Sequence, residues 1–240
     1  MKVDYSKKST VDEIRARFDA DVERFSNLQT GQSATIDAPL AMELIARAAA
    51  VSTSPISRVL DIGCGAGNNT LKLLEYAPNL NCDLLDLSGN MLARAKARVS
   101  ASTKGNIRTF CGDFRNIPLE ENSYDVVLAC AVLHHLRDDR DWESAFKKIF
   151  SILRKGGSFW ITDLVSHSLE KVQDLMWNSY GEYLLKLGGE EYRDKVFEYI
   201  DREDTPRPFF YQLELMKSAG FSKVEILHKN SCFAAYGALK

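Results

Sequence analysis

Short apolar runs alternate along the chain with longer segments in which apolar residues recur every three or four positions. The short runs lie at residues 59–62, 82–87, 107–111, 124–129 and 158–163. Continuous apolar runs of this length are typical of buried parallel strands, and the longer period is typical of helices that cover a sheet. Their alternation predicts an α/β fold with a doubly wound sheet. A final pair of runs, at 224–228 and 233–239, predicts an antiparallel edge hairpin, which makes the predicted sheet seven-stranded and mostly parallel.

The segments that flank these runs predict four regions. Residues 1–50 predict an N-terminal helical lid, 51–163 a cofactor-binding Rossmann-like core, 164–208 a helical cap inserted after the fifth strand, and 209–240 the completion of the core sheet. Apolar positions from Val11 to Phe25 favour one amphipathic helix that begins at Ser9 or Thr10. The polar stretch 26–35 is either a solvated loop or part of the lid over a pocket. The cap favours two or three short helices, since glycines interrupt its aromatic residues.

Three glycines at alternate positions follow the first predicted strand. They are Gly63, Gly65 and Gly67, and a helical pattern begins directly after them. A strand, a glycine turn and a helix in this order are typical of nucleotide-binding α/β units, because glycine lets the backbone approach a ligand closely. Asp61 lies at the end of the strand and is expected to face the same crevice. A turn that merely requires glycine is the structural alternative.

Two more carboxylates end the second and third predicted strands. Asp86 suits the ribose hydroxyls of a nucleotide, because one carboxylate can accept hydrogen bonds from two neighbouring hydroxyls. It could instead cap the next helix, but Ser88 is better placed for that role. Asp113 could accept from an adenine amino group with Phe114 beside the ring, or it could be the Asp of a local turn.

Taken together, these motifs resemble the class I S-adenosylmethionine-dependent methyltransferases. The resemblance covers about residues 55 to 165 and the terminal helix and hairpin, and it rests on 59–67, 86–88 with Met91, 112–114, 124–127 and 153–157. It implies S-adenosylmethionine as cofactor, with the glycine turn at its amino acid end and the residues after the fourth strand near its sulfonium. The cofactor-binding residues that it implies are Asp61, Gly63, Cys64, Gly65, Gly67, Asp86, Leu87, Met91, Asp113, Phe114, Ala129 and Cys130.

A second resemblance concerns the lid and the C-terminal part. They look similar to the carboxy-S-adenosylmethionine synthase group of tRNA wobble-uridine modification. That group holds the additional carboxylate of its cofactor with a tyrosine near Gln32 and an arginine near Leu215, and this chain has neither. Because an unpaired carboxylate in a closed pocket is unfavourable by several kcal/mol or more, we expect ordinary S-adenosylmethionine to be bound.

Three residues are candidates for catalysis. Methyl transfer needs a general base only if the acceptor atom carries a proton. His134 and His135 follow the fourth strand, and Asp163 ends the fifth. Packing and helix capping are the structural alternatives for the histidines, and a cap or turn is the alternative for Asp163. The spacing of these groups predicts no metal site.

Composition narrows the possible partners. The formal net charge of -2 gives no whole-chain attraction to nucleic acid. The five cysteines are scattered, which favours reduced thiols in a cytoplasmic protein, and no apolar run is long enough to span a membrane. We therefore expect a cytoplasmic monomer or homodimer that methylates a small molecule. An RNA-modifying enzyme, suggested by the lid, and a cofactor-binding regulatory subunit without turnover are the alternatives.

Overall fold

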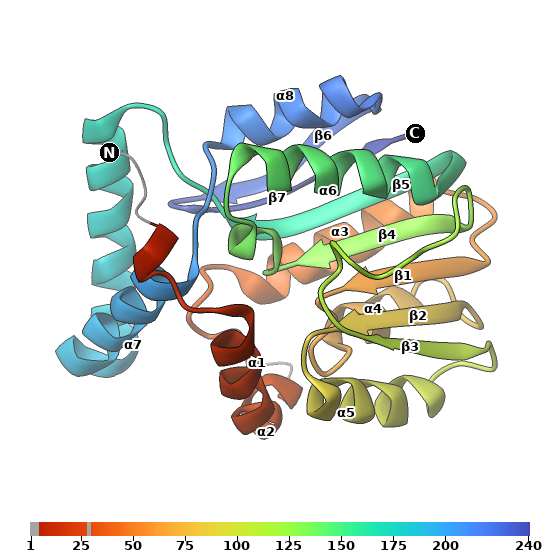
Figure 1. The fold of residues 1–240 in the computed structure, drawn as a ribbon, viewed down its shortest axis with the longest axis horizontal. Helices are drawn as coiled ribbons and strands as arrows, with labels where there is room; N and C mark the ends of the chain where they lie inside the picture. The colour runs from red at the N-terminus through yellow and green to blue at the C-terminus, as the bar shows by residue number, and fades with distance from the viewer. Residues whose placement is uncertain (1–4, 28–29) are drawn as a thin grey trace.

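The computed structural model describes residues 5–27 and 30–240, and a seven-stranded sheet forms its centre (Figure 1). The strand order is β3-β2-β1-β4-β5-β7-β6. The first five strands pair in parallel, whereas β7 is antiparallel to both β5 and β6, which confirms the predicted fold class. The strands are β1 (Arg58–Ile62), β2 (Asn81–Asp86), β3 (Ile107–Cys111), β4 (Tyr124–Cys130), β5 (Leu153–Leu164), β6 (Ser222–Asn230) and β7 (Phe233–Leu239).

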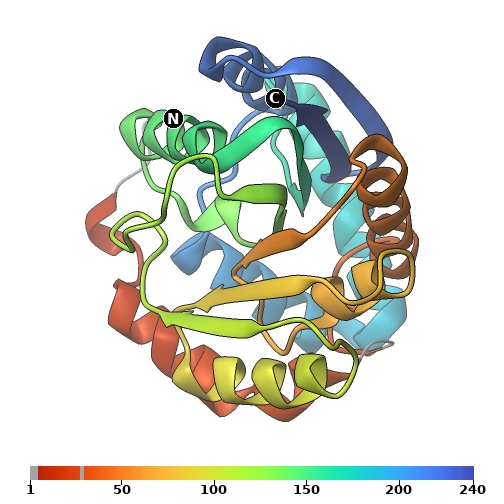
Figure 2. The same ribbon diagram turned by 90° about the vertical axis from the view of Figure 1, so that its right-hand side faces the viewer.

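Helices cover both faces of the sheet (Figure 2). One face carries α3 (Ala38–Ser52), α4 (Asn68–Leu74) and α5 (Gly89–Ser100), and the other carries α6 (Asp139–Ile152) and α8 (Phe209–Ala219). The apolar stripe of α6 is completely buried, with Trp142, Phe146 and Ile149 each 0% exposed. These two buried layers keep the strands in place, so the carboxyl ends of β1, β2 and β4 form a common edge.

The N-terminal segment departs from its prediction. A short 3-10 helix, η1 (Tyr5–Lys7), precedes two helices, α1 (Val11–Ala20) and α2 (Val22–Ser26), where the apolar period predicts one. The break lies at Asp21, whose backbone leaves the helical conformation at φ -112° and ψ 16°. The start of α1 is as predicted, because Thr10 caps it and Glu13 completes a capping box.

The cap contains α7 (Glu170–Glu203), which is assigned as one continuous segment. Gly189 interrupts it with a φ of 82°, so α7 consists of two helices joined at a kink, which agrees with the predicted number of helices although each is longer than expected. The cap has its own apolar cluster, which includes Tyr180 and Leu184 and extends to Leu164 of β5. The helices α1, α2 and α7 thereby lie at the carboxyl ends of the parallel strands (Figure 1). Neither α7 nor another helix in the described ranges is long and apolar enough to cross a membrane.

Candidate functional site

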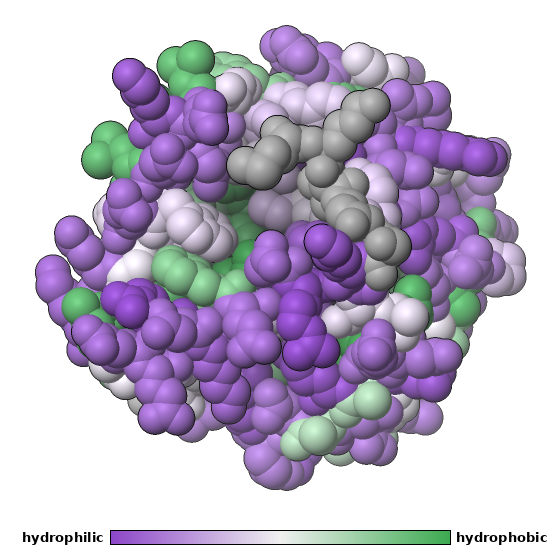
Figure 3. Space-filling model, turned by 60° about the vertical axis from the view of Figure 1, so that its left-hand side comes forward, coloured by the Kyte–Doolittle hydropathy of each residue, from purple (hydrophilic) through white to green (hydrophobic). Residues whose placement is uncertain are grey.

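Three connected cavities lie where the strand ends meet the N-terminal helices and the cap. The glycine-turn cavity surrounds the turn after β1, the outer cavity reaches Asp113 and Phe114, and the inner cavity extends under α7. Asp86 lines the first two, and His135 lines all three. Their empty volumes, which include space open to solvent, are about 680, 650 and 840 Å³. The space-filling view shows an apolar hollow with a mostly hydrophilic rim on the side that carries the cap (Figure 3).

The three glycines of the turn serve different purposes, although each has a positive φ. A Cβ on Gly63 would lie 2.6 Å from the side chain of Val132, and one on Gly67 would lie 3.1 Å from that of Val99. These two glycines therefore permit close packing. A Cβ on Gly65 would meet nothing within 4 Å, because this residue borders the open cavity. Gly65 thus leaves room for a ligand to contact the backbone.

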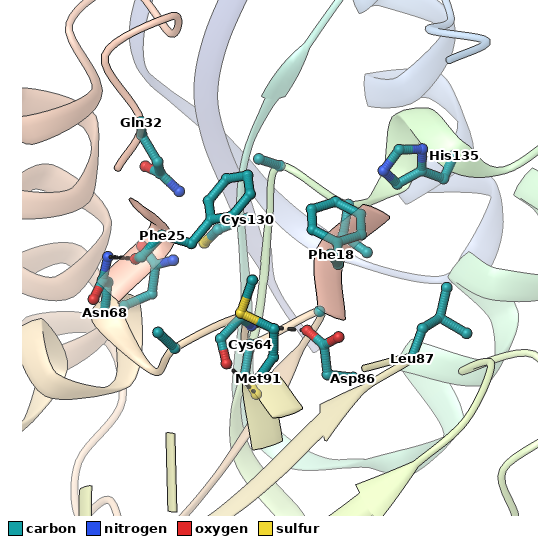
Figure 4. Close-up of a pocket in the computed structure, with 16 residues that line it drawn as sticks. Phe18, Phe25, Gln32, Cys64, Asn68, Asp86, Leu87, Met91, Cys130 and His135 are labelled. Atoms are coloured by element: carbon teal, nitrogen blue, oxygen red, sulfur yellow. Dashed lines mark hydrogen bonds between the residues drawn. The ribbon is translucent and has the colours of Figure 1, made fainter. Parts of the chain in front are cut away.

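Asp86 ends β2 between the glycine-turn and outer cavities (Figure 4). Its Oδ2 accepts a hydrogen bond from Gly65 N at 2.8 Å, and its Oδ1 accepts from Ser88 N at 2.9 Å. Burial raises the pKa of this carboxyl. Ser88 is the residue that caps α5, since its hydroxyl accepts from Met91 N at 3.0 Å. Asp86 is therefore free of the capping role that was its structural alternative.

Three residues that the sequence analysis did not assign to the cofactor site face the turn from the N-terminal segment. Phe18 and Phe25 lie over it, and Gln32 lies beside them (Figure 4). Asn68 Nδ2 donates to Phe25 O at 2.9 Å and so ties α2 to the start of α4. The helical period places both phenylalanines on the apolar face of the predicted helix. This predicts that they are buried, but it does not identify the part of the molecule that they pack against. Gln32 belongs to the polar stretch that predicted part of the lid.

The predicted cofactor-binding residues separate into two groups. Those that line the glycine-turn or outer cavity are Gly63, Cys64, Gly65, Asp86, Leu87, Met91, Cys130, Asp113 and Phe114. Asp61, Gly67 and Ala129 lie outside the lining of these cavities. Asp61 is fully buried beneath the turn, where its Oδ2 accepts from the Thr70 hydroxyl at 2.7 Å. Burial raises the pKa of Asp61 to about 7.

Asp113 shares its carboxylate with a neighbouring guanidinium. Its oxygens accept from Arg115 Nε at 3.0 Å and from Arg115 N at 2.9 Å. Burial alone would raise the pKa of Asp113, but the bonds to Arg115 outweigh it and lower the pKa. Asp113 therefore stays ionised at the wall of the outer cavity, with Arg115 beside it as a residue that the sequence analysis missed.

The histidine pair lies on the short 3-10 helix η2 (Leu133–His135), which follows β4. Asp163 of β5 holds this helix, because its Oδ2 accepts from Leu133 N at 2.9 Å and from His134 N at 3.2 Å. Its other oxygen, Oδ1, binds His134 Nδ1 and also accepts from Leu164 N at 2.7 Å. Both oxygens of Asp163 are thus occupied, so the geometry suits an orienting residue better than a free base.

Asp204, which directly follows α7, completes the cluster and was not predicted. Its Oδ1 lies 3.7 Å from His134 Nε2 and 3.1 Å from His135 Nδ1. Burial disfavours the imidazolium, but Asp204 and Asp163 outweigh it and raise the pKa of His134 to about 9. Burial likewise opposes the charge of Asp204, but His134 and His135 hold its pKa below the ordinary value. His134 is therefore a cation between two carboxylates at neutral pH.

The same cluster has the donor atoms of a cation site. One atom each from His134, His135 and Asp204 lies within 4.8 Å of the others. Both ring nitrogens of His134 face carboxylates, and its proton supplies the positive charge that a metal would otherwise bring. The absence of a metal site stays a prediction.

Comparisons with known proteins place this geometry in context. The family model described as a methyltransferase domain matches residues 59–157. The demethylmenaquinone methyltransferase of Lactococcus lactis subsp. lactis (strain IL1403) is 30% identical over 188 residues, covering 76% of this chain and 73% of the relative. The enzyme with the same name from Listeria monocytogenes serotype 4a (strain HCC23) is 24% identical and covers 77% of this chain and 78% of its own.

Solved structures are similar in fold. Human N-acetylserotonin methyltransferase in complex with S-adenosylmethionine has a TM-score of 0.56 at 18% identity, covering 90% of this chain and 57% of that one. Phosphoethanolamine N-methyltransferase 2 of Haemonchus contortus, also with S-adenosylmethionine, has a TM-score of 0.54 at 24% identity, covering 75% and 37%.

The charged state of His134 predicts a pH dependence of stability. The pKa of about 9 in the folded state lies above the ordinary histidine value of 6.5, so the contribution of His134 to stability is complete below about pH 6.5 and is lost as the pH rises through about 9. The free energy of unfolding should fall over this window by about 3 kcal/mol more in the wild type than in His134→Gln. Chemical denaturation at several pH values measures the difference. His228→Gln is the control, and equal slopes in the wild type and His134→Gln would contradict the assignment.

Proposed function

We propose that this chain, which belongs to the class I S-adenosylmethionine-dependent methyltransferases, transfers the methyl group of its cofactor to a small molecule held in the inner cavity. The observation that carries the proposal is the junction of two cavities. Phe18, Phe25, Gln32, Ala131 and His135 line both the glycine-turn cavity and the inner cavity. A methyl group at this junction would be within reach of ligands on both sides.

The chain's residues fit the cofactor in the glycine-turn and outer cavities. Gly65 leaves its side of the turn open for the amino acid end, and Asp86 lies between the two cavities where a ribose would join adenine to the sulfur. Phe114 and Leu87 offer apolar surfaces for the adenine ring in the outer cavity. Bound S-adenosylmethionine supplies a methyl group on a sulfonium sulfur, which becomes a neutral thioether when the carbon–sulfur bond breaks.

The inner cavity suits a small acceptor with an apolar part. Its walls include Tyr180, Tyr199, Ile200 and Phe233. Its polar lining combines the histidine cluster with the side chains of Arg17, Arg24, Gln32, Thr35 and Thr162. Apolar walls with a few convergent polar groups are typical of small-molecule sites. The names of the two curated relatives, which specify a quinone precursor, support the same class of acceptor.

The two alternatives receive less support. An RNA substrate would be supported by a contiguous basic surface around Lys7, Lys8, Arg15 and Arg17, but Arg17 pairs with Glu203 at 2.5 Å and Arg15 with Asp12 at 3.0 Å. These ion pairs reduce the charge available for phosphates. A regulatory subunit without turnover would not require an acceptor cavity that meets the cofactor cavity at a histidine.

His135 is the residue that we assign as general base. Its ring lines all three cavities, and it is the member of the pair that meets the expected methyl position. At the acceptor it would take the proton that an O–H or N–H group must lose. His134 already carries a proton at neutral pH and cannot take another, so its role is to hold the cluster together.

Gly65→Ala should fold but bind S-adenosylhomocysteine at least tenfold more weakly, because the new Cβ points into the glycine-turn cavity. Gly156→Ala is the matched control, since Gly156 also has a positive φ and open space around its Cβ position but lies outside the cavities. Both variants carry the backbone strain of about 1 kcal/mol that a left-handed alanine brings. Calorimetry measures the affinities, and equal binding by the two variants would contradict the assignment of the cavity.

Asp86→Ala should weaken cofactor binding by about 10- to 100-fold, which corresponds to the loss of charge-assisted hydrogen bonds of about 1.5–3 kcal/mol. Asp86→Asn keeps one oxygen, which can still accept from either Gly65 N or Ser88 N, so this variant loses the charge while retaining one of the two bonds to the turn. Titration calorimetry on both variants gives the result. The ribose assignment is wrong if Asp86→Ala binds as tightly as the wild type.

The acceptor class is tested with methyl-labelled S-adenosylmethionine and cell extract. The label should enter a small-molecule fraction, and His135→Asn should transfer it about 10²–10⁴-fold more slowly. His228→Asn, which changes a histidine outside the cavities, should remain active. Label in a ribonuclease-sensitive fraction would favour the RNA alternative, and cofactor binding without any transfer would favour the regulatory one.

A further inference from the structure

We propose that Asp204 is a positioning residue, which holds the His135 ring with its proton on Nδ1 and leaves Nε2 free to accept the proton of the methyl acceptor. This inference rests on the proposed function of His135 as the base. Asp204 Oδ1 lies 3.1 Å from His135 Nδ1. The carboxylate comes from the end of the cap, 69 positions along the chain from the histidine (204 − 135).

The chemistry of Asp204 favours one tautomer of the facing ring. The residue is 4% exposed, and the neighbouring imidazolium of His134 keeps it ionised. An ionised carboxylate can only accept hydrogen bonds. A neutral His135 therefore interacts best with Asp204 when Nδ1 carries the hydrogen, which leaves the lone pair on Nε2.

Within the described residues, neither nitrogen of the His135 ring forms a complete hydrogen bond, and Asp204 Oδ1 forms none either. Nδ1 is the nitrogen that lies 3.1 Å from Asp204 Oδ1, so these two atoms are the pair within hydrogen-bonding distance. The ring is held in place by Phe18, at 6.0 Å between centroids and 83° between planes, and by His134 at 4.3 Å. A fixed imidazole with a carboxylate at one nitrogen and an unused lone pair at the other is the arrangement of an oriented general base.

The position of Asp204 also couples the base to the cap. Thr205 N donates to His134 O at 2.7 Å, which joins the end of α7 to η2. Lys8 Nζ donates to Asp204 O at 2.7 Å, and Arg17 pairs with Glu203 through two hydrogen bonds. These contacts hold the end of the cap against η2 and the N-terminal segment, and they keep the carboxylate of Asp204 beside His135 at the wall of the inner cavity.

The tautomer of His135 tests the proposal directly. Long-range proton–nitrogen NMR on ¹⁵N-labelled protein at pH 8 distinguishes Nδ1–H from Nε2–H, and the chain has only four histidines to assign by single substitution. The wild type should show His135 as the Nδ1–H tautomer. Asp204→Asn should shift it toward Nε2–H, because an amide can donate to Nδ1 as well as accept from it.

Asp201→Asn is the matched control. Asp201 is an exposed carboxylate three residues before Asp204, and it lies outside the inner cavity. It should leave the tautomer unchanged. A wild-type ring with the hydrogen on Nε2, an unchanged tautomer in Asp204→Asn, or the same shift in both variants would overturn the proposal. The wild-type spectrum decides the question by itself if Asp204→Asn does not fold.

Methyl transfer by the same proteins separates this inference from the proposed function. Asp204→Asn should lower kcat by about 10²-fold or more while the affinity for S-adenosylhomocysteine stays within about twofold, because Asp204 lies outside the glycine-turn and outer cavities. A kcat equal to that of the wild type would overturn the positioning role. Full activity of His135→Asn would contradict the proposed base, whatever tautomer the NMR spectra show.

Discussion

A buried cation between two carboxylates joins the parts of this molecule. The His134 imidazolium binds Asp163 of β5 on one side and faces Asp204, at the end of α7, on the other. The cluster is stable only when all three groups are present, because a buried carboxylate that lacks its partner strongly destabilises the folded state. The cap therefore has one favourable position on the strand ends. From that position it forms the inner cavity and brings the pair Glu203–Arg17 against the N-terminal helices.

Much of the fold follows from local sequence patterns. Buried parallel strands require continuous apolar runs, and the predicted runs coincide with β1 to β4 to within two residues at their ends. Caps such as Thr10 and Ser88 could also be predicted, since their hydrogen bonds join residues three apart. The helix prediction was wrong at a place where the backbone leaves the helical conformation although the apolar period of the sequence continues. The break at Asp21 lies within an uninterrupted apolar period, and no residue type marks it.

The parts of the candidate site that are formed by residues close together in the sequence could be predicted, and the parts formed by distant segments could not. The proposed cofactor side depends on residues directly after strands, so the sequence could locate Gly65 and Asp86, which both line the glycine-turn cavity. The acceptor side depends on the packing of distant segments, and Asp204 carries no sequence signal that sets it apart. The position of a residue at the end of a strand also does not determine which way its side chain points. Asp61 and Asp163 both end strands, yet the oxygens of Asp163 are occupied by η2 and Leu164, and Asp61 lies beneath the turn.

A residue with a left-handed backbone conformation lies at the junction between the glycine-turn cavity and the inner cavity. Ala131 follows β4 with a φ of 53°, a left-handed conformation that is unfavourable for alanine by about 1 kcal/mol or more. Its N–H donates to Thr162 O at 2.7 Å, so the neighbouring strand maintains this turn. Because of it, Cys130 lines the cofactor cavity while His134, four residues later, lines the inner one. In the proposed function, the sheet would therefore determine where the methyl group lies, and the cap would determine which acceptor reaches it. The acceptor can therefore differ between relatives that share the cofactor site.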